Sequence, residues 1–143
     1  MKNRSVKNIF LNLLMLNGNK CTSEKLFIKS LKSVQKDFNK KKINDLIKLG
    51  LINSCPFLFL KKIKRKRKQT VEFPFMLTNK LRLFYGIKNL IKTCLTPKNQ
   101  AFANKLKNEL VNSSKNLSKS VKEKKDLHKN VVLKKKFANY RWF

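Results

Sequence analysis

The residue types that commonly carry catalysis are few and scattered in this chain. His128 is the single histidine, and Asp126 is a carboxylate close to it in sequence. Acid–base catalysis needs its partners within hydrogen-bond reach, yet residues two apart on a helix do not face each other. The sequence also holds no paired carboxylates, glycine-rich phosphate loop or nucleophile motif. It therefore argues against an enzyme, and we expect His128 to hydrogen-bond a phosphate or a neighbouring carbonyl.

Three cysteines are spread along the chain, at Cys21, Cys55 and Cys94. Zinc ligands usually come in closely spaced pairs such as Cys-x-x-Cys, and no such pair occurs here. The spacing indicates reduced thiols, most of them buried as small apolar side chains. We therefore expect no metal, no cofactor and no small-molecule substrate.

The highest density of charged side chains lies at residues 61–68, where seven of eight side chains are cationic. Pro74, a little further on, argues against a helix or a central strand. We interpret residues 57–76 as a protruding β-hairpin arm whose tip lies near residues 67–69. Alternate strand residues point to opposite faces, so a thin hairpin would present charge on both sides and suit insertion between nucleic-acid segments. A solvated basic loop or a localisation-like run is the alternative. The cations are Lys61, Lys62, Lys64, Arg65, Lys66, Arg67 and Lys68.

Two further basic groups lie near the ends of the chain. Aromatic rings and guanidinium planes stack on unpaired bases, at about 1–3 kcal/mol per base, which points to RNA contacts in the C-terminal segment 121–143. Phe137 and Trp142 have an alternative, which is to pack against the protein's own core. The N-terminal group could clamp phosphates from the other side. The C-terminal group comprises Lys122, Lys124, Lys125, Lys129, Lys134, Lys135, Lys136, Tyr140, Arg141 and Trp142, and the N-terminal group Lys2, Arg4, Lys7 and Lys20.

The charge balance supports a polyanionic partner. Thirty-six Lys and Arg residues face seven acids among 143 residues, which gives a net charge of +29. A field of one sign destabilises the compact state, whereas phosphate contacts release counterions and bind tightly at low salt. A DNA- or RNA-compacting architectural protein and a cationic membrane-surface protein are rival classes. No segment approaches the 18 or so apolar residues of a membrane span, and we expect no membrane partner.

Hydrophobic periodicity predicts a mainly α fold, a single helical-bundle domain over residues 1–143 with about six helices and the basic hairpin. Asn17-Gly18 should end the first helix, and Gly50 should cap the third. The expected helices cover 4–17, a segment beginning at Thr22 or Ser23, 41–50, a segment beginning at Thr78 or Asn79, a segment opening at Thr96-Pro97, and 121–136, with a loop over 112–120. The expected core stripes are Val6, Ile9, Phe10, Leu13 and Leu14 in the first helix, Phe27, Leu31 and Val34 in the second, Leu83, Phe84, Ile87, Leu90 and Ile91 in the fourth, and Phe102, Leu106, Leu110 and Val111 in the fifth.

Several segments of the chain resemble sequence motifs of one known protein family. The ending Phe137-Ala138-Asn139-Tyr140-Arg141-Trp142 is similar to the C-terminal Phe-Ala-x-Tyr-Arg-Trp of the bacterial-type small-subunit ribosomal protein family numbered seven (S-seven). Residues 108–111 and 121–129 resemble its Asn-Glu-Leu-Leu and Val-Lys-Lys-Arg-Glu-Asp-x-His stretches, and residues 70–74 resemble its Thr-Tyr-Gln-Val-Pro strand. The family's Gly-Gly near the hairpin tip is Arg67-Lys68 here.

The resemblance implies a structural protein of the small ribosomal subunit. Such proteins bind the 3′ major (head) domain of small-subunit rRNA, support head assembly and line the mRNA exit path and the E-site tRNA, beside ribosomal proteins of families nine and eleven. By the same resemblance, Lys62, Lys64, Arg65, Lys80 and Arg82 would contact RNA around the hairpin, and Lys122, Lys124, Lys125, His128, Arg141 and Trp142 would belong to a C-terminal RNA-facing region.

Composition indicates an A/T-rich genome. Lys, Asn, Phe, Leu and Ile are abundant, whereas Gly and Pro number three each. Organelle genomes are often of this kind, so we expect an organelle-encoded protein of the mitochondrial ribosome, with the plastid ribosome as the alternative. The basic amphipathic N-terminus could be mistaken for a transit peptide, but its apolar stripe favours a core helix.

Overall fold

The computed structural model describes residues 6–38, 40–64, 70–96 and 100–139. These residues form six α-helices, one short 3-10 helix and one two-stranded antiparallel sheet, which confirms the expected mainly α fold with a β-hairpin. The elements are α1 (Val6–Leu14), α2 (Lys20–Asp37), α3 (Lys40–Ser54), β1 (Leu58–Ile63), β2 (Val71–Met76), α4 (Asn79–Leu95), α5 (Phe102–Ser114), α6 (Lys119–Leu133) and η1 (Lys135–Phe137).

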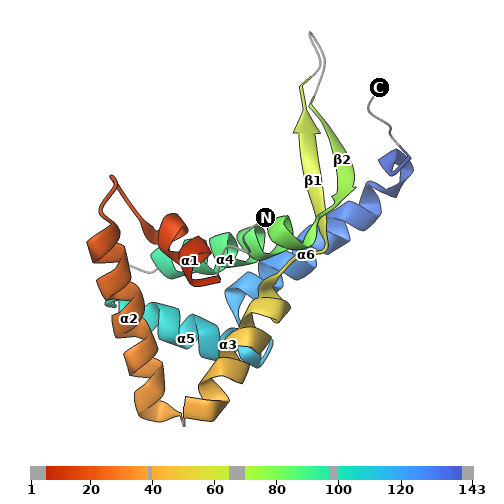
Figure 1. Cartoon of the computed structure of the whole chain (residues 1–143). Coiled ribbons are helices and arrows are strands. Elements are labelled where there is room, and N and C mark those ends of the chain that lie inside the picture. The colour runs from red at the N-terminus through yellow and green to blue at the C-terminus, as the bar shows by residue number, and fades with distance from the viewer. Residues whose placement is uncertain (1–5, 39, 65–69, 97–99, 140–143) are drawn as a thin grey trace.

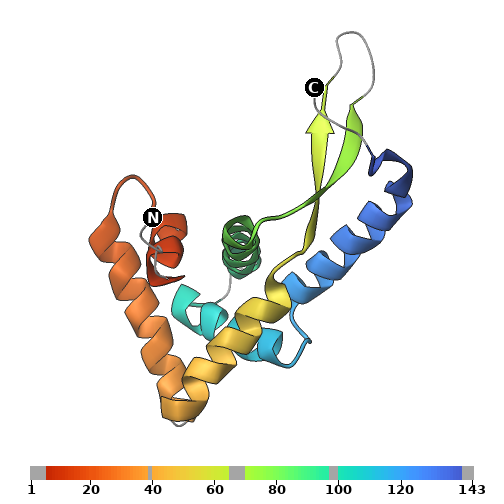
Figure 2. The ribbon, with the colours of Figure 1, turned by 45° about the vertical axis from the view of Figure 1, so that its right-hand side comes forward.

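The helices form a body from which the hairpin projects (Figure 1). Helices α2 and α3 meet in a V at the end of the body away from the hairpin, and the last turns of α6 run outward beside the hairpin (Figure 2). Among the described helices, none is both long and apolar enough to cross a membrane.

The core is centred on α4, as its apolar stripe predicts. Ile87 and Leu90 are fully buried and pack with Phe10 of α1, Leu51 of α3 and Leu106 of α5. Residues three and four apart share one helix face, so one stripe of α4 can meet three other helices.

Two predicted core residues lie at the margin instead. Phe84 of α4 is 37% exposed and makes an edge contact with the ring of Tyr85. Val6, the first residue of α1, is 38% exposed. Each lies at the edge of its apolar stripe, where the neighbouring helices leave it partly uncovered.

The turn before α2 is as expected, but its cap is not. Asn17 and Gly18 take left-handed φ angles of 50° and 77° after α1 has ended. Helix α2 then begins at Lys20, so Thr22 and Ser23 lie inside its first turn rather than at its cap. Their hydroxyls donate to the carbonyl oxygens of Asn19 (2.8 Å) and Lys20 (2.7 Å), which is back-bonding and not capping.

Gly50 does not end α3, which continues to Ser54. A Cβ at Gly50 would lie 2.6 Å from Ser113 Oγ and 3.1 Å from the Leu110 carbonyl oxygen of α5. This glycine therefore allows α3 and α5 to approach closely, which explains its place inside a helix.

The region between α4 and α6 differs from prediction in two ways. Thr96 is the C-terminal cap of α4 and α5 begins only at Phe102, so Thr96 does not cap α5; Pro97 lies outside the described residues. Helix α5 continues to Ser114, which shortens the expected loop over 112–120. Ser118 caps α6, because its Oγ accepts from the Val121 N–H at 3.2 Å.

Candidate nucleic-acid interface

The hairpin presents cations on both of its faces. Lys61 pairs with Phe73 across the sheet, and the next residue, Lys62, pairs with Glu72 and so points to the opposite face. Lys62 Nζ lies 3.3 Å from Glu72 Oε1, whereas Lys61 Nζ lies 5.8 Å from the centre of the Phe75 ring. Both lysines and Lys64 beyond them are exposed. The expected charge on two faces is thus confirmed for the described part of the arm.

Aromatic contacts hold the base of the hairpin to the rest of the protein. The ring of Phe59 in β1 stacks on Tyr85 of α4, with ring centres 4.5 Å apart. Phe73 in β2 is 3% exposed and meets Phe137 of η1 edge-on at 5.6 Å. Two strands alone are only marginally stable in water, so these contacts on two sides fix the direction of the arm. Phe137 accordingly packs against the protein, which was one of the two alternatives considered for it.

Phe57, just before β1, is held by two residues that were predicted to contact RNA. The guanidinium of Arg82 lies 3.5 Å from the centre of the Phe57 ring, a cation–π contact. Arg82 Nη1 donates to Asn79 Oδ1 at 3.3 Å, while its Nε is buried and has no hydrogen-bond partner among the described residues. His128 Nε2 accepts from the Phe57 N–H at 3.2 Å. The partner that the structure describes for His128 is therefore a backbone N–H and not a carbonyl oxygen, whereas its contact with a phosphate stays a prediction.

The contact from His128 requires an unprotonated Nε2. Burial lowers the pKa of His128 from its ordinary 6.5, and the ammonium of Lys124 lowers it further. Lys124 Nζ in turn donates to the Asn53 carbonyl oxygen at 2.8 Å, close to the C-terminal end of α3. Burial is also the main cause that lowers the pKa of Lys124, with Arg82 and Lys125 adding repulsion and Cys55 opposing it. Lys124 thus ties α6 to α3, a structural role that the sequence did not indicate.

The start of α6 is anchored from α5. Glu109 Oε1 accepts the backbone N–H of Ser120 at 3.1 Å, and Ser118 Oγ lies 2.8 Å from Ser120 Oγ in a buried cluster. A carboxylate at a helix N-terminus also complements the helix dipole. The contact gives a physical reason for the Asn-Glu-Leu sequence in α5, because the glutamate sets the direction in which α6 leaves the body.

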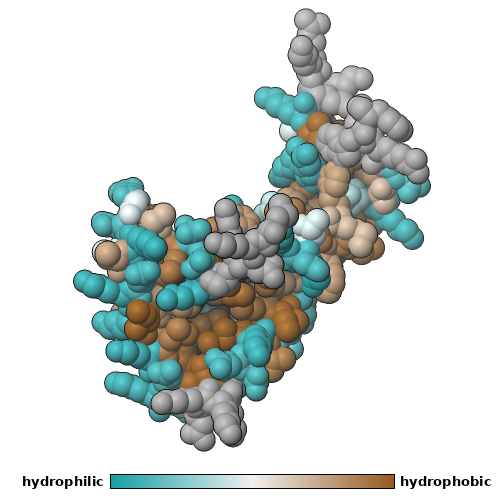
Figure 3. All heavy atoms as spheres, viewed as in Figure 1, coloured by the Kyte–Doolittle hydropathy of each residue, from teal (hydrophilic) through white to brown (hydrophobic). Residues whose placement is uncertain are grey.

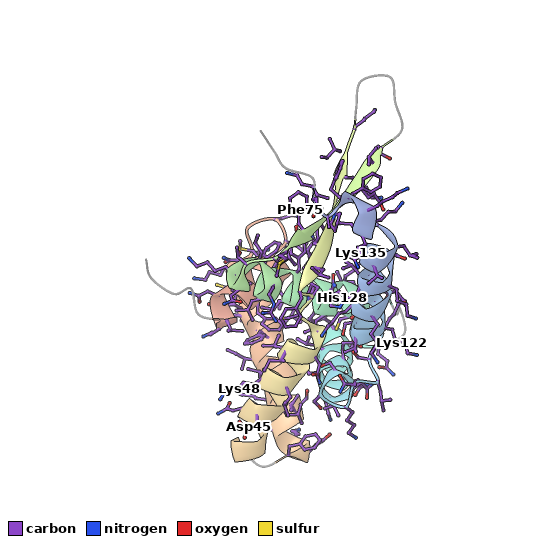
Figure 4. All side chains as sticks on the ribbon, turned by 90° about the vertical axis from the view of Figure 1, so that its right-hand side faces the viewer. Asp45, Lys48, Phe75, Lys122, His128 and Lys135 are labelled. Atoms are coloured by element: carbon purple, nitrogen blue, oxygen red, sulfur yellow. The ribbon has the colours of Figure 1, made fainter. Side chains whose placement is uncertain are left out.

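Helix α6 carries its remaining cations outward along the arm. Figure 4 shows Lys122 and His128 on α6 and Lys135 on η1, in this order toward Phe75 of the hairpin. Lys122 and Lys125 are exposed, and Lys129 is exposed with its Nζ 3.9 Å from Asp126 Oδ1, a weak surface pair. Asp126 therefore pairs with a lysine, and no contact between it and His128 is described.

A family model described as ribosomal protein S7p/S5e matches residues 1–133. The chain belongs to this family.

Curated relatives of the S7p/S5e chain occur in plastids, bacteria and mitochondria. "Small ribosomal subunit protein uS7c" of Euglena gracilis is 24% identical over 140 residues, covering 98% of this chain and 88% of the relative. "Small ribosomal subunit protein uS7" of Wigglesworthia glossinidia brevipalpis is 26% identical with the same coverage. "Small ribosomal subunit protein uS7m" of Reclinomonas americana is 27% identical over 136 residues, covering 93% and 82%. Membership implies a structural small-subunit ribosomal protein and not an enzyme, with small-subunit rRNA and ribosomal proteins as partners.

The other predicted contacts of this S7p/S5e chain divide into two sets. Lys7, Lys20 and Lys80 are exposed, on α1, α2 and α4 respectively. The rest lie outside the described residues, and these are Lys2, Arg4, Arg65, Lys66, Arg67, Lys68, Arg141 and Trp142.

Two of the three cysteines are buried. Cys55 and Cys94 are buried and Cys21 is exposed, all as free thiols. Burial raises the pKa of Cys94 to about 12, so this thiol stays protonated. Among the described residues no group of three His, Cys, Asp or Glu side chains could hold a metal.

The sequence analysis did not identify a group of four exposed lysines on α2, although their spacing of four, three and four residues is visible in the sequence. These lysines are Lys25, Lys29, Lys32 and Lys36.

Proposed function

We propose that this chain binds the 3′ major domain of small-subunit rRNA, supports assembly of the head, and does so mainly through the hairpin and α6. The observation that carries the proposal is the arm itself, which projects from the body with exposed Lys61 and Lys62 on opposite faces. An arm of this kind can lie between two RNA segments and contact phosphates on both. The resemblance of residues 70–74 and 121–129 to the family's own sequences supports the same surface.

The mechanism is charge neutralisation combined with a fixed shape. Each lysine that meets a phosphate releases counterions, which gives affinity but little sequence selectivity. Selectivity comes from the angle of the arm, which Tyr85, Phe137, Arg82 and His128 hold at its base. An RNA fold that offers two phosphate ridges at the right spacing is then preferred over a plain duplex.

Further partners and the domain boundary belong to the same proposal. The arm would line the mRNA exit path and the E-site tRNA, with ribosomal proteins of families nine and eleven as neighbours. Residues 1–143 would act as a single domain, because α3, α4, α5 and α6 all pack against one another and α6 also packs against β1 of the arm.

The proposed location is the mitochondrial ribosome, with the plastid ribosome second. The Lys-, Asn- and Phe-rich composition favours an organelle genome. Relatives in Reclinomonas americana and Euglena gracilis, named as the uS7m and uS7c proteins, support both organelles.

The test is chemical footprinting of the protein on small-subunit rRNA, with excess tRNA and duplex DNA as competitors. We expect discrete protection confined to the 3′ major domain. Replacing Lys61 and Lys64 together by Gln should remove part of that protection and lower the salt slope of binding by about two, one for each phosphate contact. The matched control replaces Lys115 and Lys119, exposed at the α5–α6 junction, by Gln. Diffuse protection that either competitor abolishes would overturn the proposal.

A further inference from the structure

A row of lysines lines a groove on the side of the body away from the hairpin. The groove measures about 530 Å³ and lies between α2 and the first turn of α5. The described residues that line it include no carboxylate and one large apolar side chain, Ile28. Its four lysines are Lys25, Lys29, Lys32 and Lys36.

The spacing places these lysines along one helix face. Successive members are four, three and four residues apart, which is the pattern of neighbours on an α-helix. At about 1.5 Å per residue the row from Lys25 to Lys36 extends over about 16 Å. All four side chains are exposed, and hydrophilic side chains project along the outer edge of α2 in Figure 3.

No acid of the described chain neutralises the row. The described ion pairs include none of its four lysines. Asp37, at the end of α2, is paired with Lys107 of α5 instead. Glu24 precedes Lys25 directly, but adjacent residues on a helix do not face each other. The charge of the row is therefore open to an external anion.

We infer that the lysine row of α2 is a second RNA-binding surface, which takes the phosphate backbone of an RNA segment other than the one held by the hairpin. This inference rests on the proposed rRNA binding and extends it to the opposite side of the body.

The lining favours RNA over a protein partner. Protein interfaces are depleted in Lys and draw their energy from Trp, Tyr and Arg anchors, and the described residues of this groove include none of these three types. A second hollow of about 520 Å³ shares Asn104 with the groove and continues it past Gln100 and Asn108. Side-chain amides bind phosphate and sugar oxygens, so the two hollows together suit a polynucleotide backbone.

The positions of α2 and the hairpin require separate RNA contacts. Helix α2 lies on one side of the body and the hairpin projects from the other in both ribbon views (Figures 1 and 2). A single straight helix of RNA cannot follow both surfaces, whereas folded rRNA can present two segments. The protein would then hold two parts of one RNA fold together.

Cys21 offers a direct probe of this surface. It is the exposed cysteine, it lies on α2 one turn before Lys25, and Cys55 and Cys94 are buried. An iron–EDTA group attached to Cys21 by a maleimide cleaves nearby RNA by hydroxyl radicals. On small-subunit rRNA with the full chain, we expect discrete cuts at a segment distinct from the one that the hairpin protects. A C21S variant given the same reagent controls for cuts from other positions.

Charge variants decide between the outcomes. Replacing Lys29 and Lys32 by Gln keeps helix propensity, so folding is retained. This variant should abolish the Cys21-directed cuts and lower the salt slope of RNA binding by about two. The matched control replaces Lys88 and Lys92, both exposed on α4, and should leave the cuts in place.

Two other results would overturn the inference in distinguishable ways. In the first, the Lys29/Lys32 variant leaves both the cuts and the salt slope unchanged while the hairpin still protects its RNA segment. That result would assign the row to a non-RNA partner and would leave the proposed function standing. Absence of any discrete protection by the unaltered protein would remove the proposed function and this inference with it.

Discussion

Gly86 of α4 meets the chain immediately before the hairpin, and replacing it by alanine should loosen the arm's base. A Cβ at this position would lie 2.6 Å from Cys55 Sγ, 3.1 Å from Cys55 Cα and 3.3 Å from Cys55 N. Ordinary contact begins at 3.4 Å, so the Sγ contact alone must widen by about 0.8 Å. Two of the three neighbouring atoms belong to the backbone, which cannot rotate away as a side chain can.

The expected magnitude follows from two opposing effects. Alanine gains about 1 kcal/mol over glycine inside a helix, whereas overpacking a buried site costs about 1–3 kcal/mol. Because the neighbouring backbone atoms cannot rotate away, the upper part of that cost applies, about 2–3 kcal/mol. We therefore expect the free energy of unfolding to fall by about 1–2 kcal/mol. For a chain of this length that corresponds to a decrease in Tm of about 3–8 °C.

The assay is thermal and urea unfolding of G86A, C55A and the double variant at one fixed salt concentration. Removing the Cys55 sulfur relieves the shortest contact, so the double variant should lose at least about 0.5 kcal/mol less than the sum of the two single losses. Gly18→Ala serves as the control, because no atom lies within 4 Å of its added Cβ and its cost comes from a φ of 77°. That variant should combine additively with C55A. A G86A protein as stable as the parent, or strict additivity with C55A, would refute the reasoning.

Three further predictions concern the supports of the arm. The folded protein lowers the pKa of His128, so the stability that the neutral imidazole contributes is present above its ordinary pKa of 6.5 and is lost as the pH falls below that value. Urea unfolding at pH 7.5 and 5.5 should show this loss of folding stability. The H128Q variant keeps a hydrogen-bond acceptor and should show a smaller loss. K124M removes the bond to Asn53 and should lower the free energy of unfolding by about 0.5–1.5 kcal/mol without altering the RNA footprint, whereas exposed K125M should not change stability. E109A should cost about 0.5–2 kcal/mol, the usual price of a lost helix cap, and E109Q should restore most of it; equal stability of E109A and the parent in thermal unfolding would contradict the cap.

The fold was predictable where local pattern decides the structure. The α4 stripe of Ile87, Leu90 and Ile91 has helical spacing, and the structure places it at the core. The hairpin follows from apolar and aromatic runs on both sides of a basic block, since such residues favour strands. In both cases the residues that fix the element are close together in sequence.

Prediction failed where distant segments decide the role of a residue. Gly50 has the sequence context of a helix cap, but its contact is Ser113, 63 positions later. RNA contact by Arg82, Lys124 and His128 stays a prediction, but the sequence did not indicate that each of them also contacts a group of the protein. Asn53, the partner of Lys124, lies on α3, and Phe57, the partner of His128 and Arg82, lies in the segment before β1. No pattern along α4 or α6 identifies either partner.

The placement of Lys124 and Arg82 explains how a strongly basic chain can still hold a stable arm. Both cations satisfy polar or aromatic groups of the protein, yet each lies close enough to the other that Arg82 contributes to lowering the pKa of Lys124. The free protein therefore carries repulsion at the base of its arm, in addition to the repulsion expected from a net charge of +29. Phosphates that bind beside the arm would reduce this repulsion, so RNA binding and the stability of the arm are coupled. Added salt must then change the stability of the free arm and the affinity for RNA in opposite directions. It raises the stability of the free arm because it screens the repulsion within the protein, and it lowers the affinity because it weakens the phosphate contacts.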